Sequence, residues 1–111
     1  MRRISQSRQK HYELYIQSKK ELTAELLESG KLSKTGFPLC ERCNTREGTD
    51  FHHKAQRFGA LLWYKPMLCW LCRECHRFSH ENPRQARKEG WIVDLTQEQR
   101  NAIRDEALKQ L

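Results

Sequence analysis

The chain lacks a long apolar run. No stretch of its 111 residues approaches the roughly eighteen consecutive apolar residues of a membrane span, so we expect no membrane-spanning segment. The first fifteen residues carry charge without an apolar segment behind it, which argues against a secretory signal and favours the cytoplasm. Only 37% of the residues are hydrophobic. The length predicts one domain, and this is little apolar material for its core. We therefore expect an additional stabilising element.

Acidic side chains are also in deficit. There are 14 Asp and Glu against 21 Lys and Arg, which gives a formal net charge of +7. The excess lies in residues 1–94, because the last seventeen residues carry three of each sign. A basic balance favours a polyanionic partner, most often nucleic acid. Solubility alone explains such a balance equally well, so charge does not decide the function.

The N-terminal half is predicted to hold a long helix. Apolar side chains recur three or four residues apart over residues 5–29, and Gly30 is a typical C-terminal stop. The apolar positions are Tyr12, Tyr15, Ile16, Leu22, Leu26 and Leu27. A short linker with the sequence GKLSKTGFP follows the helix. Residues 50–54 and 67–71 are then short enough and apolar enough to be strands.

Three further helices are predicted after the second strand. The first covers residues 73–80. The second is predicted to begin at Pro83, with Asn82 as its N-cap, and to stop at Gly90. The last runs over residues 97–111 and opens with a capping box formed by Thr96 and Gln99. Its apolar stripe is Ile103, Ala107 and Leu111.

Five cysteines in a reducing compartment argue for metal rather than for disulfides. Four of them form two C-x-x-C pairs, which are Cys40, Cys43, Cys72 and Cys75. Each pair can present two thiolates to one ion, and four thiolates at about 2.3 Å in a tetrahedron make a structural zinc site. Zinc binding would add folding energy to the lean core. Unrelated buried or redox cysteines are the alternative, and Cys69 is interpreted as a small buried apolar residue.

Four of the five histidines flank the second cysteine pair. His76 and His80 are four residues apart, so on a helix they share a face and can bind one ion together. His52 and His53 are adjacent, so on a strand they face opposite ways. We therefore predict a second metal site at His52, His76 and His80, with positions open for water and phosphate. His53 is left free as a general base. The alternative is that His80 caps a helix end and His52 packs.

The pattern CERC…FHHK…LCRECHRFSH resembles the HNH endonucleases, whose nuclease core is a ββα-metal fold. The resemblance covers about residues 37–83 and includes the double histidine, both zinc knuckles and the histidine directly after the last cysteine. The ending CHRFSHENPRQARKEGWIV is similar to small phage or prophage members. The resemblance implies an α+β chain: a basic helix and linker over residues 1–36, the ββα-metal core, and helices over residues 84–111 packed on that core.

The resemblance also implies roles for the site residues. The four knuckle cysteines would hold structural zinc. His52 would take the first metal-ligand position, His53 the general-base position, and His76 the final histidine of the motif, which is a ligand. His80 matches the extra ligand of members with an H-x-x-x-H ending, such as the colicin-type DNases.

The implied activity is metal-dependent hydrolysis of phosphodiester bonds in nucleic acid, most simply DNA, leaving a 5′ phosphate. One active centre in a monomer favours nicking. The second divalent ion would be Mg, Mn, Ni, Co or Zn, and imidazole ligands suit the last four better than Mg. Arg57, Arg73 and Arg77 are predicted to bind neighbouring phosphates, with plain surface charge as the alternative. A phage, replication or packaging protein is a further expected partner, in a bacterial or phage-infected cell.

One departure from the family pattern concerns the general base. The family usually has an asparagine before the second cysteine pair, where it orients the base histidine. That place falls at or near Met67 here, and no asparagine lies between Asn44 and Asn82. The usual Gly-Gly of the loop is reduced to Gly59. Three interpretations stay open: a backbone carbonyl orients the base, cleavage is slow, or the chain is a non-catalytic zinc module that binds nucleic acid or a protein.

Overall fold

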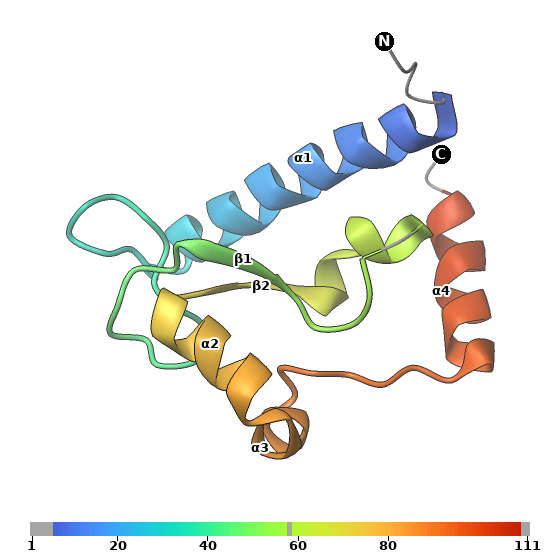
Figure 1. Cartoon of the computed structure of the whole chain (residues 1–111). Helices are drawn as coiled ribbons and strands as arrows, with labels where there is room; N and C mark the ends of the chain where they lie inside the picture. The colour runs from blue at the N-terminus through green and yellow to red at the C-terminus, as the bar shows by residue number, and fades with distance from the viewer. Residues whose placement is uncertain (1–5, 58, 110–111) are drawn as a thin grey trace, which may run out of the picture.

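The structure is a computed structural model that describes residues 6–57 and 59–109. Within these residues it is an α+β fold with one two-stranded sheet and four α-helices (Figure 1). The elements are α1 (Gln6–Glu28), β1 (Asp50–His53), the 3₁₀ turns η1 (Gly59–Leu62) and η2 (Lys65–Met67), β2 (Leu68–Leu71), α2 (Arg73–Glu81), α3 (Pro83–Glu89) and α4 (Gln97–Leu108). The predicted α+β class is therefore confirmed. No helix among the described residues combines the length and apolar character needed to cross a membrane.

The end of α1 shows why local sequence predicted this helix well. Gly30 adopts φ of 79°, a conformation that side chains disfavour. The amide of Gly30 donates to the carbonyl of Leu27 at 3.1 Å, and the amide of Lys31 donates to that of Leu26 at 2.9 Å. These two bonds make a Schellman motif, which satisfies carbonyls that the helix itself cannot pair.

The start of α4 carries the predicted capping box. The backbone amide of Gln99 donates to Thr96 Oγ1 at 3.1 Å, and the amide of Thr96 donates to Gln99 Oε1 at 2.9 Å. Ala107 of the predicted apolar stripe is fully buried, and Ile103 lines a pocket shared with η1. The predicted end of this helix at Leu111 lies outside the described residues.

At the junction between α2 and α3, one predicted helix cap differs from the structure. As predicted, α3 begins at Pro83 and stops before Gly90, its C-cap, which has φ of 89°. Asn82, however, makes no side-chain cap for α3. Its side-chain amide instead donates to the carbonyl of Phe78 at 3.4 Å, which also accepts from the Asn82 backbone amide at 2.8 Å, so Asn82 serves the end of α2.

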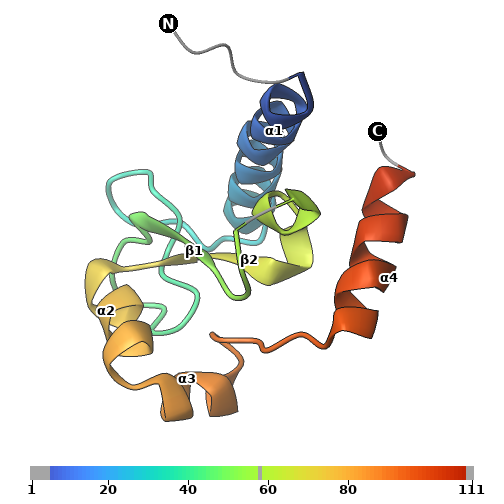
Figure 2. The same ribbon diagram turned by 45° about the vertical axis from the view of Figure 1, so that its right-hand side comes forward.

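The sheet separates two sets of side chains. β1 and β2 are antiparallel, with the pairs Asp50–Leu71, Phe51–Trp70, His52–Cys69 and His53–Leu68. Alternation along a strand sends Phe51 and Trp70 to one face. There α1 packs on them: the rings of Tyr15 and Phe51 lie 5.7 Å apart, and Trp70 Nε1 donates to Thr23 Oγ1 at 3.1 Å. α2 lies on the opposite face (Figures 1 and 2).

The hydrophobic core consists largely of cysteine side chains. The buried cluster comprises Cys40, Cys69, Leu71, Cys72 and Cys75, with Cys43 and Trp91 packed against it. Cys69 is fully buried in β2 as predicted, and burial raises the pKa of its thiol to about 12. It is therefore a neutral packing residue at pH 7.

The loop between the two strands forms η1 and η2 and lies beside two helices. Both α1 and α4 contact η1, and the views in Figures 1 and 2 place this turn between them. Leu61 and Trp63 are the buried side chains of this region, with 6% and 3% of their surfaces exposed. This loop matters for the site because it reaches the end of β1.

Candidate functional site

The four predicted cysteines converge. Cys40 and Cys43 lie in a turn before β1, whereas Cys72 is the N-cap of α2 and Cys75 lies in its first turn. In each pair the later amide donates to the earlier sulfur, at 3.5 Å for Cys43 and 3.3 Å for Cys75. All four sulfurs lie within 4.8 Å of one another. Sulfurs at about 2.3 Å from a tetrahedral ion are about 3.8 Å apart, so this cluster could hold a structural metal ion such as zinc.

Arg42 supports this cluster from between the first two ligands. Its Nη1 lies 3.5 Å from Cys75 Sγ, and its guanidinium lies 3.8 Å from the centre of the Phe78 ring. Its Nε donates to Glu89 at 2.8 Å, and this hydrogen bond, with weaker ones from Gln85 and Trp91, lowers the pKa of Glu89 to about 2. Four thiolates around one divalent ion carry a net negative charge, which the guanidinium offsets. No sequence motif marks Arg42 for this role.

The three predicted histidine ligands also converge. His52 projects from β1 and is 4% exposed, whereas His76 and His80 lie one turn apart on α2. One ring nitrogen of each lies within 4.8 Å of the others, and the Nε2 atoms of His76 and His80 are 3.3 Å apart. Two nitrogens at about 2.1 Å from a tetrahedral ion are separated by about 3.4 Å, close to the spacing of His76 and His80, so this cluster could hold a metal ion.

Hydrogen bonds fix the tautomers of two of these rings. His76 Nδ1 lies 3.0 Å from Asp50 Oδ2, and His52 Nε2 lies 2.6 Å from the carbonyl oxygen of Trp91. A carboxylate and a carbonyl only accept, so each of these nitrogens carries the proton. Nε2 of His76 and Nδ1 of His52 are left with lone pairs for an ion. Asp50 shares its strand face with His52, so a spacing of two could have identified it, whereas the Trp91 carbonyl has no signature in sequence.

His53 faces away from this cluster, as predicted from strand alternation. Its ring stacks on Tyr15 of α1, with centroids 5.7 Å apart and planes 20° apart. Its Nε2 donates to the carbonyl of Leu62 at 3.0 Å, which leaves the Nδ1 lone pair free. Burial lowers the pKa of His53, the Leu62 hydrogen bond opposes the shift, and the charge of Arg57 adds to it. The imidazole is therefore neutral at pH 7 and able to accept a proton.

One pocket of about 290 Å³ joins the two histidine environments. It lies at the end of β1 and is lined by His52, His53 and His80, and also by residues 54–56, 92–95 and Arg100. Potential metal ligands and a neutral imidazole thus open onto the same space. This arrangement can place a metal-bound phosphate beside a base.

The three predicted phosphate-binding arginines, Arg57, Arg73 and Arg77, are exposed, and none of them lines this pocket. Arg73 lies 3.7 Å from Asp50, and Arg57 acts on His53 through its charge. Arg77 is exposed on α2. The cationic side chains that line the pocket, among the described residues, are Lys54 and Arg100. Lys54 directly follows the histidine pair, but Arg100 comes from α4 and only the fold brings it there.

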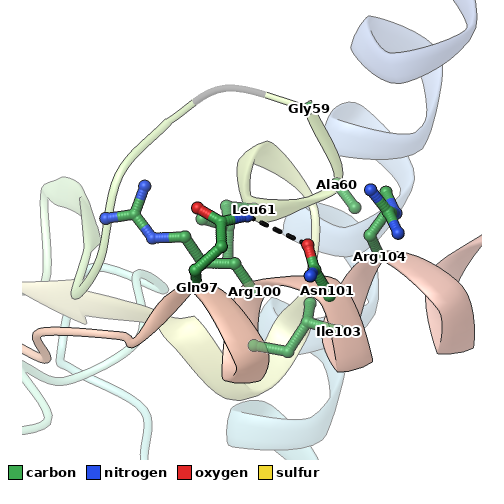
Figure 3. A pocket seen from close by; sticks show the side chains of 8 residues that line it. All are labelled: Gly59, Ala60, Leu61, Gln97, Arg100, Asn101, Ile103 and Arg104. Carbon is green, nitrogen blue, oxygen red and sulfur yellow. Dashed lines mark hydrogen bonds between the residues drawn. The ribbon is translucent and has the colours of Figure 1, made fainter.

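A second pocket of about 210 Å³ separates η1 from α4 (Figure 3). Arg100 lines this pocket as well as the histidine pocket. Figure 3 shows the guanidinium groups of Arg100 and Arg104 directed to opposite sides, although both project from α4. Both arginines therefore line the pocket beside η1, but only Arg100 of the two also lines the histidine pocket.

No protein-family model, curated protein or solved structure matches the chain. The interpretation of the site therefore depends on its own geometry. That geometry defines an α+β protein with a cysteine cluster suited to a structural metal ion and a histidine-lined pocket beside it.

Proposed function

We propose that this chain is a metal-dependent endonuclease of the HNH type, which hydrolyses phosphodiester bonds of DNA and most simply nicks one strand. The observation that carries the proposal is the shared pocket. It is lined by members of a three-imidazole cluster and by His53, an imidazole with a free nitrogen. A structural metal site alone would require neither the second cluster nor the separate base.

Each histidine has a distinct task in this proposal. A divalent cation held by His52, His76 and His80 would act as a Lewis acid on the scissile phosphate and stabilise charge on the leaving oxygen. His53 accepts the proton of the attacking water at Nδ1, because its Nε2 already donates to Leu62.

Cationic side chains would hold the substrate. Lys54 and Arg100 line the pocket, and each can donate to phosphate oxygens. The net charge of +7 supports binding along the nucleic-acid backbone. Such contacts carry affinity without sequence specificity, so binding should weaken as salt rises.

The rival proposal is a zinc module that binds nucleic acid or a protein without cleaving it. Its main support is the absence of an asparagine near Met67 to orient the base. The Leu62 carbonyl offers His53 an acceptor that needs no side chain, and this contact favours the catalytic proposal.

Relaxation of supercoiled plasmid tests the proposal. Protein that retains zinc at its cysteines but is stripped at the histidines would receive Mg, Mn, Ni, Co or Zn one at a time, with His53→Ala run alongside. We expect nicking that needs an added ion and falls by at least about 100-fold in His53→Ala. Zinc content and circular dichroism would establish that the variant is folded. Failure of every ion to support cleavage, or full activity in the variant, would contradict the proposal.

A further inference from the structure

The acceptor that holds His53 is a main-chain atom. The Leu62 carbonyl has no rotamer of its own, so its direction follows from the backbone at residues 62 and 63. Whatever fixes the following residue, Trp63, therefore fixes the acceptor. The structure contains such an anchor.

Trp63 is held by α1 at both its backbone and its ring. Ser18 Oγ donates to the Trp63 carbonyl at 2.6 Å, and Trp63 Nε1 donates to His11 Nδ1 at 2.8 Å. The rings of His11 and Trp63 stack, with centroids 6.2 Å apart. Ser18 is 7% exposed and Trp63 is 3% exposed, so the hydrogen bond between them is shielded from competing water, whereas the contact to His11 is partly buried.

The same face of α1 also holds the ring of the base. Tyr15, which stacks on His53, lies four residues after His11 and three before Ser18. Residues at these spacings share one helix face. One face of α1 therefore contacts both His53 and the segment that carries its acceptor.

The turn before Trp63 is supported from its other side by α4. Leu61 is buried, and α4 contacts η1 across the pocket in Figure 3. The segment that carries the acceptor thus lies between two helices, so the contacts from α1 act on a confined turn.

We propose that this face of α1, acting through Trp63, positions the base histidine in place of the missing asparagine. The positioning residues are His11, Tyr15, Ser18 and Trp63. Each acts through His53 or its acceptor, and the catalytic consequence rests on the proposed nuclease function. If the acceptor moves, His53 can place its proton on Nδ1, and that nitrogen can then no longer accept a proton from water.

Ser18→Ala is the primary test, because it removes one hydroxyl from the full-length chain and keeps a good helix former. Thr23→Ala is the matched control, since Thr23 also lies on α1 and also bonds a tryptophan, Trp70, but lies on the sheet side. Ser18→Thr restores a hydroxyl. We expect Ser18→Ala to lower kcat about tenfold at constant KM, Ser18→Thr to recover it, and Thr23→Ala to leave it unchanged.

A second readout does not need activity. The ¹⁵N shifts of histidine in zinc-loaded protein report which ring nitrogen carries the proton. We expect His53 as the Nε2–H tautomer in the wild type and in Thr23→Ala, and a mixture of tautomers in Ser18→Ala.

The outcomes separate the two proposals. If no ion supports cleavage but the His53 tautomer still depends on Ser18, the nuclease proposal fails and the positioning role stands. If the wild type cleaves while Ser18→Ala matches it in kcat and tautomer, the positioning role is wrong and the nuclease proposal stands. An Nδ1–H tautomer in the wild type would also overturn the positioning role.

Discussion

Asp50 is the side chain on which the histidine cluster depends most directly. Its carboxylate accepts from His76 Nδ1 at 3.0 Å, and Arg73 lies 3.7 Å away on the exposed side. A carboxylate behind a ligating imidazole fixes the ring and makes the other nitrogen a better donor to a metal. Asp50 should therefore set metal affinity without touching the ion.

Asp50→Asn should weaken the second site. We expect the affinity of the histidine cluster for Zn or Ni to fall about 10- to 100-fold, because the ring loses its anionic partner. Calorimetric titration of protein that already carries one zinc measures this affinity. Asp105→Asn, which removes an exposed partner of Arg104, is the control and should bind normally. Unchanged affinity in Asp50→Asn would show that the carboxylate does not support the site.

At this scale the candidate ligands could be predicted from the sequence, and so could Asp50 from its spacing to His52, whereas the main-chain partners of His52 and His53 could not. C-x-x-C and H-x-x-x-H are local spacings that a turn or a helix converts directly into shared geometry. The acceptors for His52 and His53 are the carbonyls of Trp91 and Leu62. Main-chain atoms leave no residue type to recognise, so only the folded chain reveals them.

At the scale of elements, α4 contributes to the histidine pocket an arginine that lies far from the other site residues in the sequence. Arginines near the ligands in sequence were predicted to bind phosphate, yet Arg100 reaches the pocket from a helix far along the chain. Its neighbour Arg104, one turn later, lines the other pocket and pairs with Asp105. The two arginines share a helix and a charge but differ in direction (Figure 3).

Arg100→Ala should therefore weaken DNA binding more than Arg104→Ala. Loss of one phosphate contact should reduce the slope of log affinity against log salt by about 1, whereas Arg104→Ala should leave the slope nearly unchanged. Fluorescence anisotropy of a labelled duplex at several salt concentrations measures both. Equal effects of the two variants would mean that general charge, and not the pocket, governs binding.

Ion pairs whose strength depends on pH join α1 to η2. Lys65 Nζ lies 3.1 Å from Glu21 and 2.9 Å from Glu25, and Gln17 donates to Glu21 at 3.0 Å. The hydrogen bonds from Gln17 and Lys65 lower the pKa of Glu21 from its ordinary value of 4.5. Because the folded-state pKa is lowered, this stabilisation is present above pH 4.5 and is lost as pH falls through the folded-state value.

Lys65→Met should lower the free energy of unfolding at pH 7 by about 0.5 kcal/mol, as expected for an exposed pair. The pKa of Glu21 should rise in the variant but stay below 4.5, because Gln17 still donates to it. Urea unfolding measures the first quantity and carboxyl ¹³C shifts the second. A stability difference that grew as pH fell would contradict the assigned sign.

Element boundaries were predictable where chain-local chemistry sets them. Gly30 and the Thr96 capping box define helix ends through bonds within a few residues. The turns η1 and η2 were not predicted, since their shape depends on packing between α1 and α4. The position of the Leu62 acceptor therefore depends on tertiary contacts.

At the scale of the whole molecule, the four-cysteine cluster is part of the hydrophobic core. The largest fully buried side chains, among the described residues, are Leu71, Cys40, Cys69 and Ser79. The cysteine pairs also join the turn before β1 to the start of α2. A chain with little apolar surface to bury thus has within its core a cysteine cluster that could hold a structural ion.

Loss of the cysteine-bound ion should therefore unfold the core and disable the histidine cluster in one step. His76 directly follows Cys75, so α2 cannot lose its first turn and keep His76 in place. We expect Cys72→Ser, or strong chelation, to lower Tm by roughly 20 °C or more and to abolish metal binding at the histidines.

Cys69→Ala separates the loss of a ligand from the loss of a buried sulfur. Cys69 is fully buried, as Cys40 is, but lies outside the four-cysteine cluster. This variant should keep its zinc and its second-site affinity and should lose only about 1 kcal/mol of stability through the small cavity it creates. Zinc content, thermal unfolding and titration of the second site would be measured on both variants. If Cys72→Ser stayed folded and still bound an ion at the histidines, this fold would not depend on a metal ion at the four cysteines.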